Sequence, residues 1–164
     1  MPEFLGGWGD DTSSQTASTI LPSEAAKKVC QLRNWRVSNL EIQKILYLAH
    51  MVYMGRYGED QPLVAENFEA WDYGPVLPSV YHRVKAFGSG PVRNVFQAFQ
   101  NLPPGRESDV LEEAVRSVAN KTPGELVAIT HWEQGAWAKH YTPGWRGHAI
   151  PNHDIYEEYL KRVA

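Results

Sequence analysis

"LEIQKILYLAHMVYMGRYG", residues 40–58, is the stretch that decides the fold. Its apolar side chains recur with the i, i+3, i+4, i+7 spacing that marks one face of an α-helix. These side chains are Ile42, Ile45, Leu46, Ala49, Val52 and Tyr53. Ser38 and Glu41 form a capping box at its start, and Gly55 and Gly58 are expected to end it. The pattern predicts a central helix that the rest of the chain buries.

Other helices are expected before and after this central one. A first helix is predicted to start with Ser23 as its N-cap, and others over residues 78–87, 109–119 and 122–132. A final helix is predicted with Asn152 as its cap, and partial alternation over residues 63–73 predicts a short strand or strand pair. The fold class is therefore mostly α (α+β), a single compact domain of five or six helices with a small β element.

Residues 69–88, "EAWDYGPVLPSVYHRVKAFG", place rigid and aromatic groups between the predicted strand and the next helix. Gly74 and Pro75 are expected to break the strand, and Pro78 fits the first turn of a helix. We expect Trp71 in the core, and Tyr73 and Tyr81 on a surface.

Composition narrows the class of protein. The chain has 164 residues, which suits one domain, and its net charge of −3 argues against a general nucleic-acid binder. Lys and Arg are absent between Arg56 and Arg83, an interval rich in Asp and Glu. This interval predicts an acidic surface that would favour a basic protein partner. No apolar run is long enough to predict a membrane span.

The N-terminal segment and the single cysteine lead to two further expectations. Residues 1–21 are expected to be a flexible leader and residues 22–164 the folded domain, because the first twenty residues lack Lys and Arg and are rich in Gly, Ser and Thr. Cys30 is the only cysteine, so no intramolecular disulfide can form, and a reducing compartment, the cytoplasm, is expected.

Motifs for catalysis or metal binding are incomplete. His131 and Glu133 match the H-x-E start of a zinc deaminase, but the required pair of cysteines is missing. His140, His148 and His153 are close in sequence but lack a supporting carboxylate pattern. No Gly-rich phosphate loop or nucleophile elbow is present. We therefore predict no catalytic, cofactor-binding or metal-binding residues.

Two alternative functions stay open on the residues alone. One is a small enzyme with a pocket formed by His131, Tyr81 and Asp72. The other is a DNA-binding regulator of its own operon, which would need a basic helix face. The candidate residues for that face are Lys27, Lys28, Arg33 and Arg36.

Three blocks of the chain carry a resemblance to a known family. They are residues 40–58, residues 68–88 and residues 125–160, which contain Gln43-Lys44, "WDYGPVLPSVY" from Trp71, and Thr130-His131. In this order and spacing they resemble the Panacea domain of SocA-like antitoxins, over roughly residues 22–160. One departure is Ala136, which stands where the family often has proline before the tryptophan, so the turn there is expected to be looser.

The resemblance implies a function without catalysis. It implies an antitoxin that binds and neutralises a toxin encoded beside it, as an adaptor that delivers the toxin to the ClpXP protease. The expected partners are therefore the cognate toxin and ClpX. The expected hot spots of the partner surface are aromatic and apolar residues. They are Tyr73, Pro75, Val76, Tyr81, Trp132 and Trp137.

Overall fold

The computed structural model describes residues 19–164, and most of the predicted leader lies outside the described residues. The described part contains seven α-helices, one 3-10 helix and three short strands. In chain order they are α2 (Pro22–Leu32), α3 (Asn39–Tyr57), β1 (Phe68–Trp71), β2 (Gly74–Val76), α4 (Pro78–Val84), η1 (Lys85–Phe87), α5 (Arg106–Ser117), α6 (Pro123–Thr130), α7 (Ala136–His140), β3 (Ala149–Ile150) and α8 (Asn152–Val163). The predicted mostly α class is confirmed.

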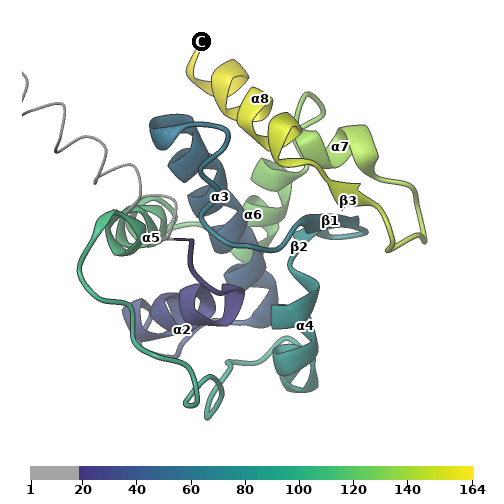
Figure 1. Cartoon of the computed structure of the whole chain (residues 1–164). Coiled ribbons are helices and arrows are strands. Elements are labelled where there is room, and N and C mark those ends of the chain that lie inside the picture. The colour runs from purple at the N-terminus through teal and green to yellow at the C-terminus, as the bar shows by residue number, and fades with distance from the viewer. Residues whose placement is uncertain (1–18) are drawn as a thin grey trace, which may run out of the picture.

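Helix α3 runs through the middle of the molecule and packs against α2, α4, α5, α6 and α8 (Figure 1). Its predicted apolar face is buried, with Val52 the one partly exposed member. The capping box at its start is formed as predicted, because the Ser38 hydroxyl accepts from the Glu41 N–H and the Glu41 carboxylate accepts from the Ser38 N–H. The second predicted capping box, Thr122 with Glu125, starts α6 in the same way.

Gly55 does not end α3, and the helix continues to Tyr57 with Gly58 as its C-cap. Gly55 instead lies where α3 meets α8. A Cβ atom there would stand 2.3 Å from Cδ2 of Tyr159, so only glycine lets the two helices approach this closely. Gly55 is therefore needed for the packing of α3 against α8. The sequence alone does not distinguish a glycine of this kind from one that ends a helix.

The sheet has the antiparallel order β2-β1-β3 and lies beside α3, which β2 contacts (Figure 1). Gly74 and Pro75 do not break the strand as predicted, because they form strand β2, and Trp71 pairs with Gly74 across the tight turn. Proline is tolerated there because β2 is an edge strand of the sheet. Strand β3 and helix α7 were also missed, since both are short and lie in a region rich in Gly and Pro.

Two predicted helix caps are displaced by a residue or two. Helix α2 begins at Pro22, so Ser23 lies inside it and Leu21 precedes it. Helix α8 begins at Asn152 and Pro151 holds the N-cap position, while the Asn152 side chain contacts Nε2 of His50 at 2.9 Å. Ile20 forms an isolated bridge with Val64, so the end of the predicted leader is attached to the fold.

Candidate functional site

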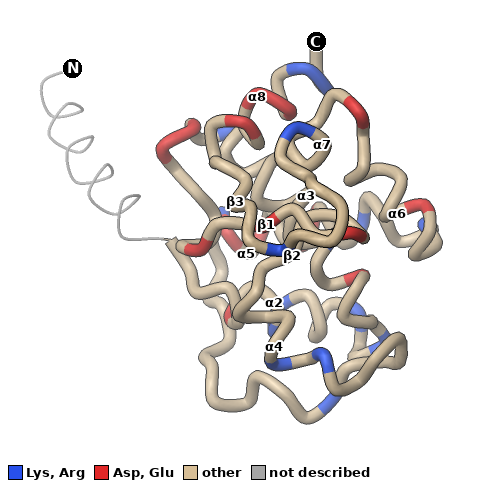
Figure 2. The backbone as a smooth tube through the Cα atoms, turned by 90° about the vertical axis from the view of Figure 1, so that its right-hand side faces the viewer, with Lys and Arg blue, Asp and Glu red and all other residues tan. Residues whose placement is uncertain are grey.

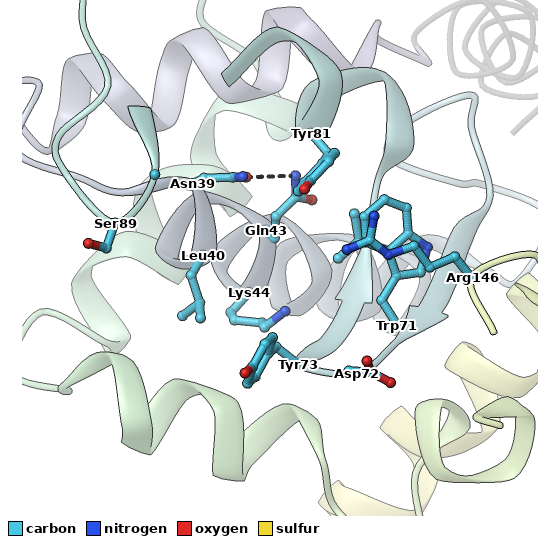
Figure 3. Close-up of a pocket in the computed structure, with 12 residues that line it drawn as sticks. Asn39, Leu40, Gln43, Lys44, Trp71, Asp72, Tyr73, Tyr81, Ser89 and Arg146 are labelled. Carbon is cyan, nitrogen blue, oxygen red and sulfur yellow. Dashed lines mark hydrogen bonds between the residues drawn. The ribbon is translucent and has the colours of Figure 1, made fainter. Parts of the chain in front are cut away.

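A pocket of about 330 Å³ opens between the first turns of α3, the β1–β2 hairpin and α4. The loop between α7 and β3 closes one side of it. Figure 3 shows α3 supplying Asn39, Leu40, Gln43 and Lys44, and the hairpin supplying Trp71, Asp72 and Tyr73. The lining residues are Asn39, Leu40, Gln43, Lys44, Trp71, Asp72, Tyr73, Val76, Tyr81, Gly88, Ser89 and Arg146.

One wall of the pocket is aromatic and carries a cation. The Trp71 and Tyr81 rings meet edge to face with centroids 4.7 Å apart, and the Arg146 guanidinium lies 4.2 Å from the Trp71 ring centroid (Figure 3). Glu69 fixes the indole by accepting from its Nε1 at 2.9 Å. Within residues 19–164 Arg146 makes no hydrogen bond or salt bridge, so stacking holds its flat face and leaves its N–H edge available.

Lys44 is a buried cation at the base of the pocket. Its side chain is 1% exposed, and its Nζ atom donates to the Pro75 carbonyl at 3.2 Å. Burial lowers the pKa of Lys44 to about 7. Gly74 lies directly over the amine, with φ +118°, and a Cβ atom there would stand 2.9 Å from Nζ. The glycine is therefore required both by its left-handed backbone and by the lysine beneath it.

Gln43, which precedes Lys44 in α3, connects α3 to the residue that follows the hairpin. Its Nε2 donates to Asn39 at 3.2 Å, and its Oε1 accepts from the Leu77 N–H at 2.8 Å. Leu77 is the N-cap residue of α4, so this buried amide fixes the start of that helix against α3. Gln43 thus positions α4, while Lys44 supports β2.

Asp72 ties the pocket loop to the hairpin. Its Oδ1 accepts from the Tyr141 hydroxyl at 2.6 Å and from the Gly144 N–H at 3.2 Å. These two hydrogen bonds, together with the charge of Arg146, hold the pKa of Asp72 below its usual value. The carboxylate is exposed, yet its contacts place the loop that carries Arg146 beside Trp71.

Three of the six predicted partner-binding residues meet at this pocket. Tyr73 is 72% exposed at the pocket, and Tyr81 and the buried Val76 also line it. Figure 3 labels the two tyrosines. Trp71 is buried at 7% exposure as predicted, but its ring still forms part of the pocket wall. The surface prediction for Tyr81 holds in part, because the side chain is half-buried against Trp71.

The other three predicted residues lie elsewhere or are covered. Pro75 is buried within β2, and Trp137 is buried behind the hairpin, where its Nε1 donates to the Trp71 carbonyl at 2.7 Å. Trp132 is half-buried outside the pocket, with the Arg162 guanidinium 4.7 Å from its ring centroid. Pro75 and Trp137 therefore support the pocket from within and offer little surface to a partner.

His131 does not share the pocket with Tyr81 and Asp72, which both line it. Its ring stacks on Trp137 with centroids 3.7 Å apart, and its Nε2 atom is buried with no partner among residues 19–164. Burial and the charge of Lys44 lower the pKa of His131, although a hydrogen bond with the Tyr73 backbone opposes them. The three residues of the enzyme alternative are thus not brought together.

Several carboxylates of the predicted acidic surface already contact other side chains of this chain. Glu59 binds His153, Glu66 binds Ser79, Glu69 binds Trp71, and Asp72 binds Tyr141. In Figure 2 the Asp and Glu segments are spread over α8, α5, α6 and the sheet region, while Lys and Arg gather toward α2 and α4. The ionisable side chains that line the pocket include Lys44, Asp72 and Arg146, and the Glu69 carboxylate contacts the Trp71 indole of its wall.

Most of the basic residues proposed for DNA binding already contact other groups of this chain. Lys27 donates to the Phe99 carbonyl at 2.6 Å, Lys28 pairs with Glu112 at 3.4 Å, and Arg33 pairs with Glu41 at 3.7 Å. Arg36 is exposed. These four residues therefore do not form a row of free cations along one helix.

The clustered histidines have separate contacts. His140 contacts Asp154 at 2.6 Å, His153 contacts Glu59 at 2.8 Å, and His148 stacks on Trp145. Across residues 19–164 no three His, Cys, Asp or Glu side chains converge as metal ligands would. None of the helices in that range is both long and apolar enough to span a membrane.

Sequence reasoning missed Arg146 and the role of Lys44. Arg146 reaches the pocket only because Asp72 holds a loop that is more than sixty residues away in sequence. Lys44 had a local signal, since the polar pair Gln43-Lys44 interrupts the apolar face of a helix that is buried on most sides. A buried lysine in such a position indicates a specific contact or a site.

Comparison with known proteins gives two matches. Residues 42–138 match the family described as "Antitoxin SocA-like, Panacea domain". The chain is 34% identical over 115 residues to "Antitoxin SocA" of Caulobacter vibrioides (strain NA1000 / CB15N). That alignment covers 62% of this chain and 58% of the relative, so the chain spans less than two thirds of the relative's length. No solved structure matches significantly.

Proposed function

Because the chain belongs to the SocA-like antitoxin family with a Panacea domain, we propose that it binds and neutralises a protein toxin encoded beside it. The observation that carries the proposal is the position of the family match. Residues 42–138 include most of α3, the whole hairpin and α4, which together form most of the pocket. The part of the chain shared with the family thus supplies most of the lining, while Asn39, Leu40 and Arg146 lie outside the matched residues.

The pocket has the character of a protein-binding surface. Tyr73 stands exposed at its rim, and Trp71 and Tyr81 form a rigid wall beside Arg146. Tyr, Trp and Arg are enriched among the residues that dominate binding energy in protein interfaces. We therefore propose Tyr73, Tyr81 and Val76 as the partner contacts among the six expected residues, with Pro75 and Trp137 supporting them.

The test is co-expression with the neighbouring reading frame. We expect its product to stop growth when expressed alone and to be tolerated when this chain is present. The two proteins should then co-purify, and Tyr73→Ala should weaken both effects without loss of folding. Growth arrest that this chain does not relieve, or relief without any complex, would contradict the proposal.

We further propose delivery of the toxin to the ClpXP protease in the cytoplasm as the mode of neutralisation. Adaptor delivery and simple masking differ in the fate of the toxin. With delivery, the half-life of the toxin should shorten when this chain is present, and it should lengthen again in cells that lack ClpX. If the toxin stays abundant but inactive in both strains, neutralisation works by masking and the adaptor role is wrong.

A further inference from the structure

The pocket of the proposed toxin-binding surface holds more positive than negative charge. Arg146 and Lys44 line it together with one carboxylate, that of Asp72. Oδ1 of Asp72 is already used by the Tyr141 hydroxyl and the Gly144 N–H. A carboxylate from outside would therefore meet the N–H groups of Arg146, with the Lys44 amine buried beneath, whereas a basic side chain would be repelled by Arg146.

Arg146 is prepared to receive a planar anion. Stacking on Trp71 at 4.2 Å, with Tyr81 at 5.5 Å, fixes the plane of the guanidinium. Because its N–H groups have no acceptor among residues 19–164, they remain available for a carboxylate. An arginine held in this way loses less conformational freedom on binding than a mobile one. Figure 3 shows its side chain lying across the Trp71 ring.

Lys44 adds a second cation at the base. Its ammonium has three donors, and the Pro75 carbonyl is the acceptor found within the described part of the chain. Since Lys44 is almost fully buried, its charge, when the amine is protonated, acts more strongly on a bound anion than that of a surface lysine would. Trp71, Val76 and Leu40 supply the apolar part of the pocket.

We propose that this pocket receives an Asp or Glu side chain of the toxin, with Arg146 as its direct partner and Lys44 as a second cation beneath it. The inference rests on the proposed function. It reverses the expectation from sequence that the region would favour a basic partner. The volume of about 330 Å³ is at the lower end for ligand pockets and suits a side chain inserted from another protein.

The experiment measures the Kd of the purified co-encoded toxin for charge variants of this chain. Arg146→Glu should weaken binding by at least about tenfold, because a carboxylate would then face a carboxylate. Lys44→Met should weaken it by a smaller factor. The matched control is Arg83→Glu, since Arg83 is also exposed and stacked, 4.8 Å from Phe99, but lies outside the pocket. Its Kd should change less than about twofold.

Charge reversal on the toxin identifies the occupant. Replacing surface Asp and Glu residues of the toxin one at a time with Lys should yield one variant that binds Arg146→Glu better than it binds wild type. Circular dichroism and thermal melting check that each variant is folded. Because Arg146 is exposed and lies in a loop, its replacement should leave the fold intact.

Each outcome has one meaning. If wild type fails to bind the toxin, the proposed function fails. If wild type binds and Arg146→Glu binds equally well or more tightly, the acidic occupant is wrong and a neutral or basic one replaces it. If citrate raises the melting temperature of wild type but not of Arg146→Glu, while toxin binding is unchanged by the variant, the pocket binds a small carboxylate and the inference is overturned.

Discussion

Lys44 is a buried amine, and keeping it charged inside the fold costs stability. Its amine is almost fully buried, with one hydrogen bond from Nζ, to the Pro75 carbonyl. Burial lowers the pKa of Lys44 from 10.5 to about 7. Between these two values the unfolded chain binds more protons than the folded chain, so this residue makes the free energy of unfolding rise with pH. The cost is complete below pH 7 and disappears as the pH approaches the unfolded value.

We therefore predict that Lys44→Met stabilises the protein at neutral pH. Its advantage over wild type should shrink by roughly 1 kcal/mol for each pH unit between about pH 7.5 and 9.5. Urea unfolding of both proteins across that range measures the difference. Lys121→Met, at an exposed turn, is the control and should show no such slope. A constant difference between Lys44→Met and wild type would mean that the amine is not buried as described.

Glu158 is a buried carboxylate that joins three helices. It accepts from the Tyr47 hydroxyl at 2.6 Å, from the Ala136 N–H at 2.9 Å and from Arg162 Nε at 2.8 Å. These contacts explain the departure at Ala136, because a proline there would have no N–H to donate to Glu158. The looser turn stays a prediction, and in this chain the hydrogen bond to Glu158 holds Ala136 in place.

We predict that Glu158→Ala lowers the free energy of unfolding by about 3 kcal/mol, since it leaves Tyr47 and Arg162 without their carboxylate. Glu157→Ala, one residue away on the outer part of the same helix, should cost less than about 0.5 kcal/mol. Chemical denaturation of the two variants provides the comparison. Equal effects would show that the buried network contributes little to stability.

At the scale of elements, the crossing of α3 and α8 depends on Gly55. Alanine usually stabilises a helix relative to glycine, but a Cβ atom here would stand 2.3 Å from the Tyr159 ring. We predict that Gly55→Ala destabilises the protein by roughly 1–3 kcal/mol through overpacking. The measurement is thermal or urea unfolding.

Two variants make the Gly55 prediction specific. Gly124→Ala lies in α6, where the nearest atom to a new Cβ is Thr122 Oγ1 at 3.9 Å, and it should be neutral or slightly stabilising. Gly55→Ala combined with Tyr159→Leu should recover much of the lost stability. If Gly55→Ala were as harmless as Gly124→Ala, the close approach of α3 and α8 would be wrong.

Elements with local signals were predictable from sequence, and elements set by distant contacts were not. The Ser38 and Thr122 capping boxes and the Pro78 start of α4 depend on neighbouring residues, and they are confirmed. Strand β2 contains Gly74 and Pro75, which locally favour a break, and pairing with β1 overrides that preference. Arg146 reaches the pocket through a loop that Asp72 holds, a contact that no local pattern encodes.

For the molecule as a whole, the main proposal is that the face formed by the hairpin, Tyr81 and Arg146 binds the toxin. This face combines the exposed Tyr73, the Trp71–Tyr81 wall and the stacked Arg146. Helices α5 and α8 lie on other sides of α3, and α5 is distant from the sheet in Figure 1. A complex formed through the pocket should therefore change one face and leave α5 unaffected.

Hydrogen–deuterium exchange of this chain with and without the co-encoded toxin tests that claim most directly. The account predicts slower exchange in the complex at residues 71–81 and 143–147, with α5 (Arg106–Ser117) unchanged. Slower exchange confined to α5 or α8, or no change anywhere despite a confirmed complex, would contradict it.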